Sequence, residues 1–317
     1  MKCFVTGGAG FIGSNLVDRL LTDGHRVTVY DNFSTGLLYF LRPEDRSHLT
    51  IIKGDLSDQT ELMYAMGDHD IVFHFAANAD VRFGLLNPYK DLQQNTLATF
   101  NVLEAMRADD ISKIVFSSTS AIYGNPKTIP TPEDVKFPQQ TSLYGASKLA
   151  CEGLIEAYCE GYNMQSWIFR FVSILGERYT HGHVFDFYKQ LVAHPKYLDV
   201  LGDGSQRKSY LYVQDCINGI LHAMKKSNDP VNIFNLGNDE YCRVSDSIEW
   251  ICDHLNLDPE IRYAGGKTGW VGDNPFTYLS TLKIRNTGWT STHTINESII
   301  KTVDYFDDNP IVLRRDK

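Results

Sequence analysis

The sequence predicts an α/β protein built on a doubly wound parallel sheet, with a second, smaller α/β lobe. In the first half, short apolar runs alternate with amphipathic stretches, the pattern of parallel strands joined by crossover helices. A glycine-rich stretch lies between the first predicted strand and the first predicted helix. After residue 172 the alternation ends, and glycines and prolines separate shorter elements, which suits a lobe over the strand ends.

The predicted elements follow one another in the order that this fold requires. The strands fall at residues 3–6, 26–30, 50–53, 71–75, 114–118 and 166–171, and the main helical patterns at 15–22, 92–107 and 146–160. The stretch "NIFNLG", residues 232–237, predicts one more core strand. Because that strand comes after the irregular part begins, we expect the two lobes to interleave.

Composition limits the possible partners. The chain has 317 residues, of which 43% are hydrophobic and 22% charged, and a net charge of −9. A general nucleic-acid or anionic-membrane surface is therefore not expected, and an anionic ligand must be held by a local site. The apolar run at 167–176 contains Arg170 and is too short to span a bilayer. A small-molecule ligand is favoured.

Cysteine usage favours a reducing compartment. The six cysteines show no CxxC pairing, and the chain opens inside a strand pattern rather than with a signal peptide, so we expect a cytoplasmic protein. His181 and His183 in "HGH" have no obvious third ligand, so no metal site is expected.

The stretch "VTGGAGFIGS" carries glycines at positions 7, 10 and 13, where a strand gives way to a helix. Glycines there allow a tight turn and close backbone approach to a pyrophosphate, while the helix N-terminus supplies free N–H groups. Asp31 ends the second strand and could accept the ribose hydroxyls of NAD while repelling the 2′-phosphate of NADP. A turn or helix-capping role for Asp31 is the alternative. Asp55 and Leu56 in "GDLSD" could contact the adenine, although a turn explains them nearly as well.

The stretch "YGASK" places Tyr144 and Lys148 four residues apart, on one face of a helix. A tyrosine that takes and gives a proton needs a pKa below its ordinary value of about 10, and a nearby ammonium favours the phenolate. Such pairs also occur by chance on helix surfaces. The stretch "SSTSAIYG" places four hydroxyls at the end of a buried strand, where hydroxyls also satisfy the backbone of a following turn.

Taken together, these stretches resemble the extended short-chain dehydrogenases/reductases, in the NAD-dependent nucleotide-sugar epimerase/dehydratase family with its UDP-glucose 4-epimerase-like members. The resemblance covers nearly the whole chain, through "TGGAGFIGS", "DNFSTG", "GDLSD", "HFAANADV", "SSTSAIYG", "YGASK", "LGDGSQRKSYLYVQD" and "FNLG". It implies an NAD-binding Rossmann domain at 1–172 with a return segment near 211–237, and a nucleotide-sugar-binding lobe at 173–317. It also implies a nucleotide-diphosphate sugar as substrate and a homodimer formed by helix 92–107 and the helix after Tyr144.

The resemblance implies a catalytic set of Thr119, Tyr144 and Lys148. Tyr144 would exchange a proton with a sugar hydroxyl, Lys148 would bind the nicotinamide ribose, and Thr119 would share the proton relay. His74 is expected to be structural rather than catalytic. The implied cofactor site contains Gly7, Gly10, Phe11, Ile12, Gly13, Asp31, Asn32, Ser34, Thr35, Gly36, Asp55, Leu56, Phe75, Ala76, Ala77, Asn95, Ser117, Tyr144, Lys148 and Phe171.

The implied substrate site departs from the family pattern. Ser173 stands where many UDP-hexose epimerases carry asparagine, and Lys208 and Trp270 stand where phosphate-binding arginines are common. Arg178, Arg207, Lys208 and Lys267 are the cations that could compensate. The full set is Val81, Thr119, Ser120, Ala121, Ser173, Arg178, His183, Val184, Arg207, Lys208, Trp270 and Asp273.

The residues after Thr119 bear on the reaction. Related 4,6-dehydratases carry Asp and Glu there, and related decarboxylases keep the Glu, whereas this chain has Ser120 and Ala121. Neither can titrate near neutral pH, so elimination lacks its acid and base. We therefore expect an NAD-dependent 4-epimerase, an isomerase, with UDP-hexose or UDP-hexuronic acid as the first guess. A C4 dehydrogenase or 4-ketoreductase, and an inactive NAD-binding regulator, are the alternatives.

Overall fold

The computed structural model describes residues 1–317 except 42–46, 82, 137, 271 and 315–317. The chain divides into two compact units, which are described separately. The first unit comprises Met1–Asn125, Lys136–Arg170 and Ile220–Phe234, and the second comprises Pro126–Val135, Phe171–Gly219 and Asn235–Lys317. Both units are assembled from segments distant in the sequence. The domain boundary at 172/173 stays a prediction.

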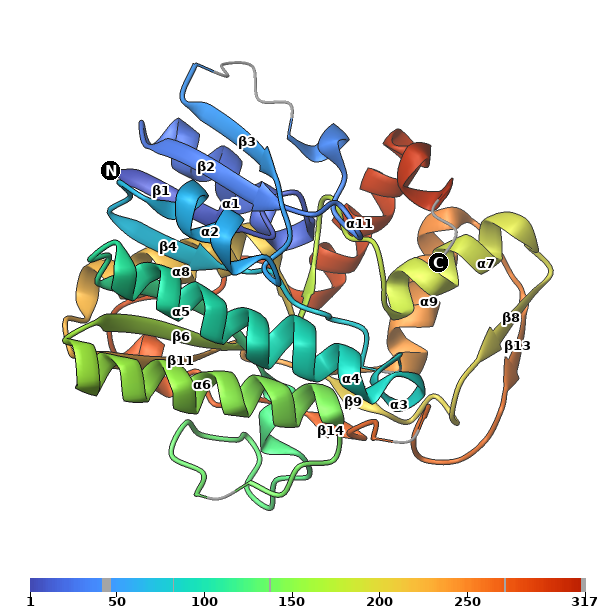
Figure 1. The fold of residues 1–317 in the computed structure, drawn as a ribbon. Helices are drawn as coiled ribbons and strands as arrows, with labels where there is room; N and C mark the ends of the chain where they lie inside the picture. Colours follow the sequence, from blue (N-terminus) through green and yellow to red (C-terminus); the bar gives the residue numbers. More distant parts are fainter. Residues whose placement is uncertain (42–46, 82, 137, 271, 315–317) are drawn as a thin grey trace. The chain divides into compact units, whose positions relative to one another are not determined.

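The main sheet has seven strands in the order β11-β6-β5-β4-β1-β2-β3 (Figure 1). β1 pairs in parallel with both β2 and β4, and β2 pairs in parallel with β3. This order, in which the chain starts centrally and winds outwards in both directions, confirms the predicted doubly wound, Rossmann-type fold. The strands are β1 (Lys2–Thr6), β2 (Arg26–Asp31), β3 (Leu49–Lys53), β4 (Ile71–His74), β5 (Lys113–Thr119), β6 (Gln165–Phe171) and β11 (Val231–Leu236).

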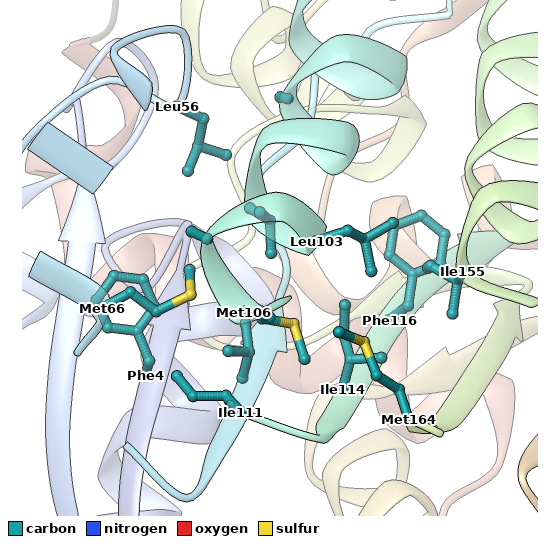
Figure 2. Packing of buried hydrophobic residues seen from close by; sticks show 14 of the residues in the cluster. Phe4, Leu56, Met66, Leu103, Met106, Ile111, Ile114, Phe116, Ile155 and Met164 are labelled. Atoms are coloured by element: carbon teal, nitrogen blue, oxygen red, sulfur yellow. The ribbon is translucent and has the colours of Figure 1, made fainter. Parts of the chain in front are cut away.

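Three helices cover one face of the sheet: α2 (Gln59–Met66), α5 (Ala98–Ala108) and α6 (Leu143–Tyr162), while α1 (Phe11–Thr22) lies on the other (Figure 1). The apolar sides of α2, α5 and α6 pack against the strands in one core. Figure 2 shows Phe4 of β1, Met66 of α2 and Leu103 of α5 in this cluster, and Ile114 and Ile155 belong to it as well. Because strands of a parallel sheet are covered on both faces, they read as continuous apolar runs in the sequence.

Two predicted helices begin earlier than expected. α1 starts at Phe11 rather than residue 15, directly after the glycine turn. α6 starts at Leu143 rather than 146, because the Ser142 side chain caps it by accepting a hydrogen bond from the Gly145 N–H. Tyr144 and Lys148 therefore both lie on α6.

The predicted helix 92–107 is two elements. Residues Leu92–Leu97 form a π-helix, η2, and α5 follows it. Two short helices, α3 (Phe83–Leu86) and α4 (Pro88–Asp91), precede it. A π-helix places an extra residue in its turn and is often found at functional sites. The sequence did not predict it.

The second unit contains shorter elements, in agreement with its irregular sequence. One two-stranded sheet pairs β7 (Ser173–Leu175) in parallel with β10 (Tyr210–Tyr212). A three-stranded sheet has the order β12 (Cys242–Arg243), β9 (Arg207–Lys208), β14 (Phe276–Thr277). A third sheet pairs β8 (Tyr197–Val200) with β13 (Glu260–Tyr263). The remaining elements are α7 (His183–Ala193), α9 (Val244–Leu255), α10 (Leu282–Arg285), α11 (Ile295–Asp308) and the 3-10 helix η4 (Pro310–Arg314). Helix α8 (Val213–Lys226) has residues in both units.

All six cysteines are buried and unpaired, with burial raising the pKa of thiols such as Cys3 to about 12. Within the described ranges, no helix combines the length and apolar character needed to cross a membrane.

Candidate active site

The glycine turn after β1 has no room for side chains at Gly7 and Gly13. A Cβ at Gly7, which has φ of +69°, would lie 2.5 Å from the backbone nitrogen of Ala76, and one at Gly13 would lie 2.2 Å from the carbonyl oxygen of Gly7. α1 opens at this turn without a side-chain cap. The positive end of the dipole of α1 thus lies at this turn, where phosphate oxygens bind favourably. The cradle fits the pyrophosphate of a dinucleotide.

Asp31 is oriented by the backbone on both sides. Its Oδ2 accepts from the Ala9 N–H at 2.9 Å, and its Oδ1 accepts from the Phe33 N–H at 2.8 Å. The second bond is the turn role that the sequence left open. The first bond ties the carboxylate to the glycine turn, and its role towards the ribose stays a prediction. A carboxylate is an acceptor-only group, as the hydroxyls of a ribose require.

The neighbouring predicted cofactor segments are joined by hydrogen bonds. Asn32 Nδ2 donates to Asp55 Oδ2 at 2.7 Å, and Asn32 Oδ1 accepts from the Ser34 N–H at 2.9 Å. Asp55 Oδ1 in turn accepts from the backbone and hydroxyl of Ser57. The "DNFSTG" and "GDLSD" stretches therefore meet at the ends of adjacent strands β2 and β3.

His74 has the structural role that we expected. Its Nδ1 lies 2.7 Å from Thr6 Oγ1 and its Nε2 lies 3.0 Å from Thr99 Oγ1. Burial, with a smaller contribution from the Lys148 charge, lowers the pKa of His74 to about 3, so the ring is neutral. Thr6 Oγ1 also accepts from the Ala76 N–H, which positions the 75–77 backbone against the glycine turn.

Thr119, Tyr144 and Lys148 lie in the first unit, on the end of β5 and the first turns of α6. The Thr119 side chain hydrogen-bonds to the Tyr144 phenol, and Thr119 Oγ1 also accepts from the Ala121 N–H at 3.1 Å. Because a threonine has a single hydroxyl proton and the backbone N–H uses an acceptor position, that proton can be directed at the phenol oxygen. The pair is arranged as a proton relay.

The pKa of Tyr144 is shifted in the direction opposite to the one expected from the sequence. Burial raises the pKa of Tyr144 to about 12, and the hydrogen bond from Thr119 opposes this shift. The same burial lowers the pKa of Lys148 to about 8. Desolvation penalises the phenolate and the ammonium alike, and it is the largest cause of both shifts.

Lys148 is 2% exposed, and among the described residues its ammonium makes no hydrogen bond. Its Nζ lies 4.4 Å from the centre of the Phe116 ring. Glu152, one turn further along α6, is instead bound by Arg170, whose Nη2 donates to Glu152 Oε2 at 2.8 Å. Arg170 also donates to the Tyr123 hydroxyl. Arg170 thus takes up hydrogen bonds of Glu152, although the Glu152 charge still favours the ammonium form of Lys148.

Asn95 lies in the π-helix η2 and belongs to a buried polar network that the sequence only partly predicted. Its Nδ2 donates to Ser147 Oγ at 2.8 Å, and its Oδ1 accepts from the Asn78 N–H at 2.8 Å. Ser147 Oγ donates to the Tyr144 carbonyl oxygen. Asp91 accepts from Asn78 Nδ2 at 2.8 Å. Sequence reasoning missed Asn78, Asp91 and Ser147, although the serine lies inside "YGASK".

The predicted phosphate-binding residues lie in the second unit. Lys208 Nζ donates to Asp273 Oδ1 at 2.7 Å and to the Asn274 carbonyl oxygen, and Asp273 Oδ2 accepts from the Gly269 N–H at 2.9 Å. The guanidinium of Arg207 lies 3.8 Å from the centre of the Phe276 ring. The charge of Lys208 is therefore compensated within the protein.

His183 also has protein partners on both ring nitrogens. Its Nε2 lies 3.1 Å from Ser247 Oγ, and its Nδ1 lies 3.2 Å from the Tyr210 hydroxyl. Burial, and to a smaller extent the Lys208 charge, lowers the pKa of His183 to about 3. In the described part of the chain, no group of three His, Cys, Asp or Glu side chains could hold a metal.

The structure divides the predicted site residues between the units. The first unit holds every predicted cofactor residue except Phe171, together with Val81, Thr119, Ser120 and Ala121. The second holds Phe171 and the rest of the predicted substrate residues. Among these, Val184 is buried, Trp270 and Ser173 are exposed, and Arg178 has φ of +70°. The roles of these residues stay predictions.

The seven-stranded sheet, the glycine cradle, Asp31 and the Tyr–Lys pair define a dinucleotide-dependent enzyme of the short-chain dehydrogenase/reductase class. Residues 3–237 match the model of the NAD dependent epimerase/dehydratase family. The chain belongs to this family, and NAD is its cofactor.

Similar proteins span the full chain. A putative UDP-glucose 4-epimerase of Methanocaldococcus jannaschii is 31% identical, with 96% of this chain and 98% of that protein covered. The crystal structure of a UDP-galactose 4-epimerase is 37% identical with a TM-score of 0.88, over 97% of this chain and 99% of the other. A UDP-glucuronic acid 4-epimerase from Bacillus cereus, solved with UDP-glucuronic acid and NAD, is 27% identical with a TM-score of 0.88, over 97% and 99%.

Proposed function

We propose that this enzyme inverts C4 of a UDP-linked sugar by removing and returning hydrogen at that carbon. One observation carries the proposal: Thr119 bonds to Tyr144 at the end of β5, and the next two side chains are Ser120 and Ala121. The site has the proton relay for oxidising an alcohol but lacks, at these positions, the acid and base for eliminating water.

NAD, when bound, supplies the acceptor that takes hydride from C4 and later returns it. Tyr144, in its phenolate form, takes the proton of the C4 hydroxyl, and Thr119 orients that hydroxyl through the shared hydrogen bond. Lys148, whose pKa burial lowers to about 8, still carries its compact positive charge at neutral pH. No carboxylate among the described residues is hydrogen-bonded to it. Tyr144 returns its proton when the 4-keto sugar is reduced on its other face.

The sugar stays open within UDP-hexoses and UDP-hexuronic acids. The names of the similar proteins include UDP-glucose, UDP-galactose and UDP-glucuronic acid, and each would present a C4 hydroxyl to Tyr144. The diphosphate would be met by Arg178, Arg207, Lys208 or Lys267 of this chain.

The test is to incubate the purified enzyme, without added NAD, with a panel of UDP-hexoses and UDP-hexuronic acids. We expect an epimer of unchanged mass by mass spectrometry and NMR, and NAD rather than NADP in the denatured supernatant. A product lighter by water or carbon dioxide would contradict epimerisation. Turnover that consumes added NAD or NADH stoichiometrically would favour the C4 dehydrogenase or ketoreductase, and no transient NADH absorbance with any sugar would favour the regulator.

We also propose that the enzyme is a homodimer. Leu92 and Leu97 of η2, Phe100 of α5 and Leu143 of α6 are exposed large apolar side chains on neighbouring elements of the first unit. A monomer seldom exposes such a group, and a second copy of the same face would bury it. Light scattering at micromolar concentration should give twice the chain mass of 35.9 kDa, and a monomer would contradict the proposal.

A further inference from the structure

Asp91 is a buried carboxylate that the proposed reaction does not use. It is the last residue of α4, and its side chain is 1% exposed. Its Oδ1 accepts from Asn78 Nδ2 at 2.8 Å and lies 3.5 Å from Asn95 Nδ2. Its Oδ2 is also buried and has no hydrogen-bond partner among the described residues. An unsatisfied buried carboxylate oxygen is costly, so its retention calls for an explanation.

The unpartnered oxygen lies beside the start of α6. A Cβ added to Gly84 would stand 2.0 Å from Asp91 Oδ2 and 3.7 Å from the Cβ of Leu143. Only a glycine at position 84 leaves room for this carboxylate. Leu143 directly precedes Tyr144, so Asp91 Oδ2 is placed next to the segment that carries the proposed acid/base.

The other oxygen connects Asp91 to Tyr144 through hydrogen bonds. Asn78, Asn95 and Ser147 form a continuous chain from Asp91 Oδ1 to the Tyr144 carbonyl oxygen. Asp91 therefore acts on Tyr144 through the network that fixes the first turn of α6, and through its charge.

We propose that Asp91 is a positioning residue for Tyr144, and that its negative charge holds the tyrosine in the protonated phenol form. This proposal rests on the proposed function, because the phenol is the form that must store the sugar proton while the 4-keto sugar is held.

The electrostatic surroundings agree with this assignment. Burial is the largest cause of the raised Tyr144 pKa. The charge of Asp91 also raises it, and Cys151 makes a smaller contribution in the same direction. Burial also raises the pKa of Asp91, with Asn78 and Lys90 opposing this and Asp80 adding to it. Thr119 is the group from β5 that favours the phenolate.

The direct test compares Asp91→Asn with the unchanged chain, because asparagine keeps the shape and the Oδ1 acceptor but removes the charge. Tetranitromethane nitrates phenolates, so the nitration rate of Tyr144 at fixed pH, followed by peptide mass spectrometry, reports its ionised fraction. We expect nitration about threefold to tenfold faster in Asp91→Asn, the order of the effect of a neighbouring like charge. Asp91→Ser should give the same direction and serves if the asparagine variant fails to fold.

The matched control is Asp58→Asn, which removes one carboxylate from the same unit and leaves a residue that caps α2 equally well. Its Tyr144 nitration rate should be unchanged. Equal rates in Asp91→Asn and the unchanged chain, or an equal acceleration in Asp58→Asn, would overturn the proposal. Nitration needs no sugar, so this result is independent of the proposed function. If epimerisation is found, the low-pH limb of its kcat/KM profile should move to lower pH in Asp91→Asn only.

Discussion

Lys148 in the first unit and Lys208 in the second are both buried or nearly buried, but they differ in whether a carboxylate binds their ammonium group. Lys148 has no carboxylate partner among the described residues, because the nearest one on its helix, Glu152, is held by Arg170. Lys208 is bound to Asp273 at 2.7 Å. An unpaired ammonium in a desolvated place acts strongly on any ligand, whereas a paired one must first exchange its partner. The comparison shows that the type of a basic residue does not by itself tell whether its charge is available to a ligand.

The largest effect on activity is expected from Tyr144, which lies on the same helix as Lys148. Tyr144→Phe removes the proton acceptor and should lower turnover by a factor on the order of 10² to 10⁴. Lys208→Met, by contrast, should mainly raise KM. Steady-state kinetics with the sugar identified by the panel measures both. Near-normal turnover in folded Tyr144→Phe would remove Tyr144 from the mechanism.

The next largest effect should come from breaking the Arg170–Glu152 pair, and it is a loss of stability. Glu152→Gln leaves the buried Arg170 side chain, 9% exposed, without its counter-charge, and should cost about 3–5 kcal/mol of unfolding free energy. Urea unfolding followed by circular dichroism measures this loss. Glu260→Gln, which breaks the exposed Arg262–Glu260 pair, is the control and should change little. Equal losses of unfolding free energy in the two variants would show that the buried pair contributes no more to stability than the exposed one.

On the Lys208 side, Asp273→Asn should release the ammonium. We expect UDP to bind several-fold more tightly, with a steeper loss of affinity as salt is added, because the freed charge now faces an anion. Titration calorimetry at two ionic strengths checks this. Asp203→Asn, at an exposed turn, is the control. Weaker UDP binding would instead mean that Asp273 contacts the nucleotide itself.

The smallest effect is the pH dependence of stability carried by Lys148. Its pKa is about 8 in the folded protein against 10.5 ordinarily, so the unfolded chain binds more protons between these values. The penalty for burying the ammonium is fully present below about pH 8 and falls as pH rises towards 10.5. Lys148→Met should therefore gain stability at pH 7 relative to the unchanged chain, and the gain should shrink by pH 10. A gain that grows with pH would contradict the assignment.

The parts of the fold that the sequence predicted depend on local patterns. Buried strands such as β1 and β5 are continuous apolar runs, and the glycine turn needs residues without side chains at fixed positions. The π-helix at Leu92–Leu97 was not predicted, because its apolar spacing also suits an ordinary helix. The lowered pKa expected for Tyr144 was wrong, because spacing gives the proximity of Lys148 but not the cost of burial.

The unpredicted parts of the site depend on contacts between distant residues. Asp273 lies 65 residues after Lys208, and nothing in either stretch indicates that they pair. The same holds for Asn95 and Ser147, which are 52 residues apart. Asp91 has no motif around it, and only its burial beside Gly84 and Leu143 connects it to Tyr144.

The burial of all six cysteines has a practical consequence for spectroscopy. Thiolates, not thiols, react with maleimide dyes, and inaccessible thiols of raised pKa react slowly. A cysteine introduced at an exposed position away from the predicted site, such as Ser112 in the first unit or Asp258 in the second, should therefore be labelled selectively in the native protein. A donor and an acceptor dye at these two positions would report the separation of the units by energy transfer, with and without UDP, while the native cysteines stay in place.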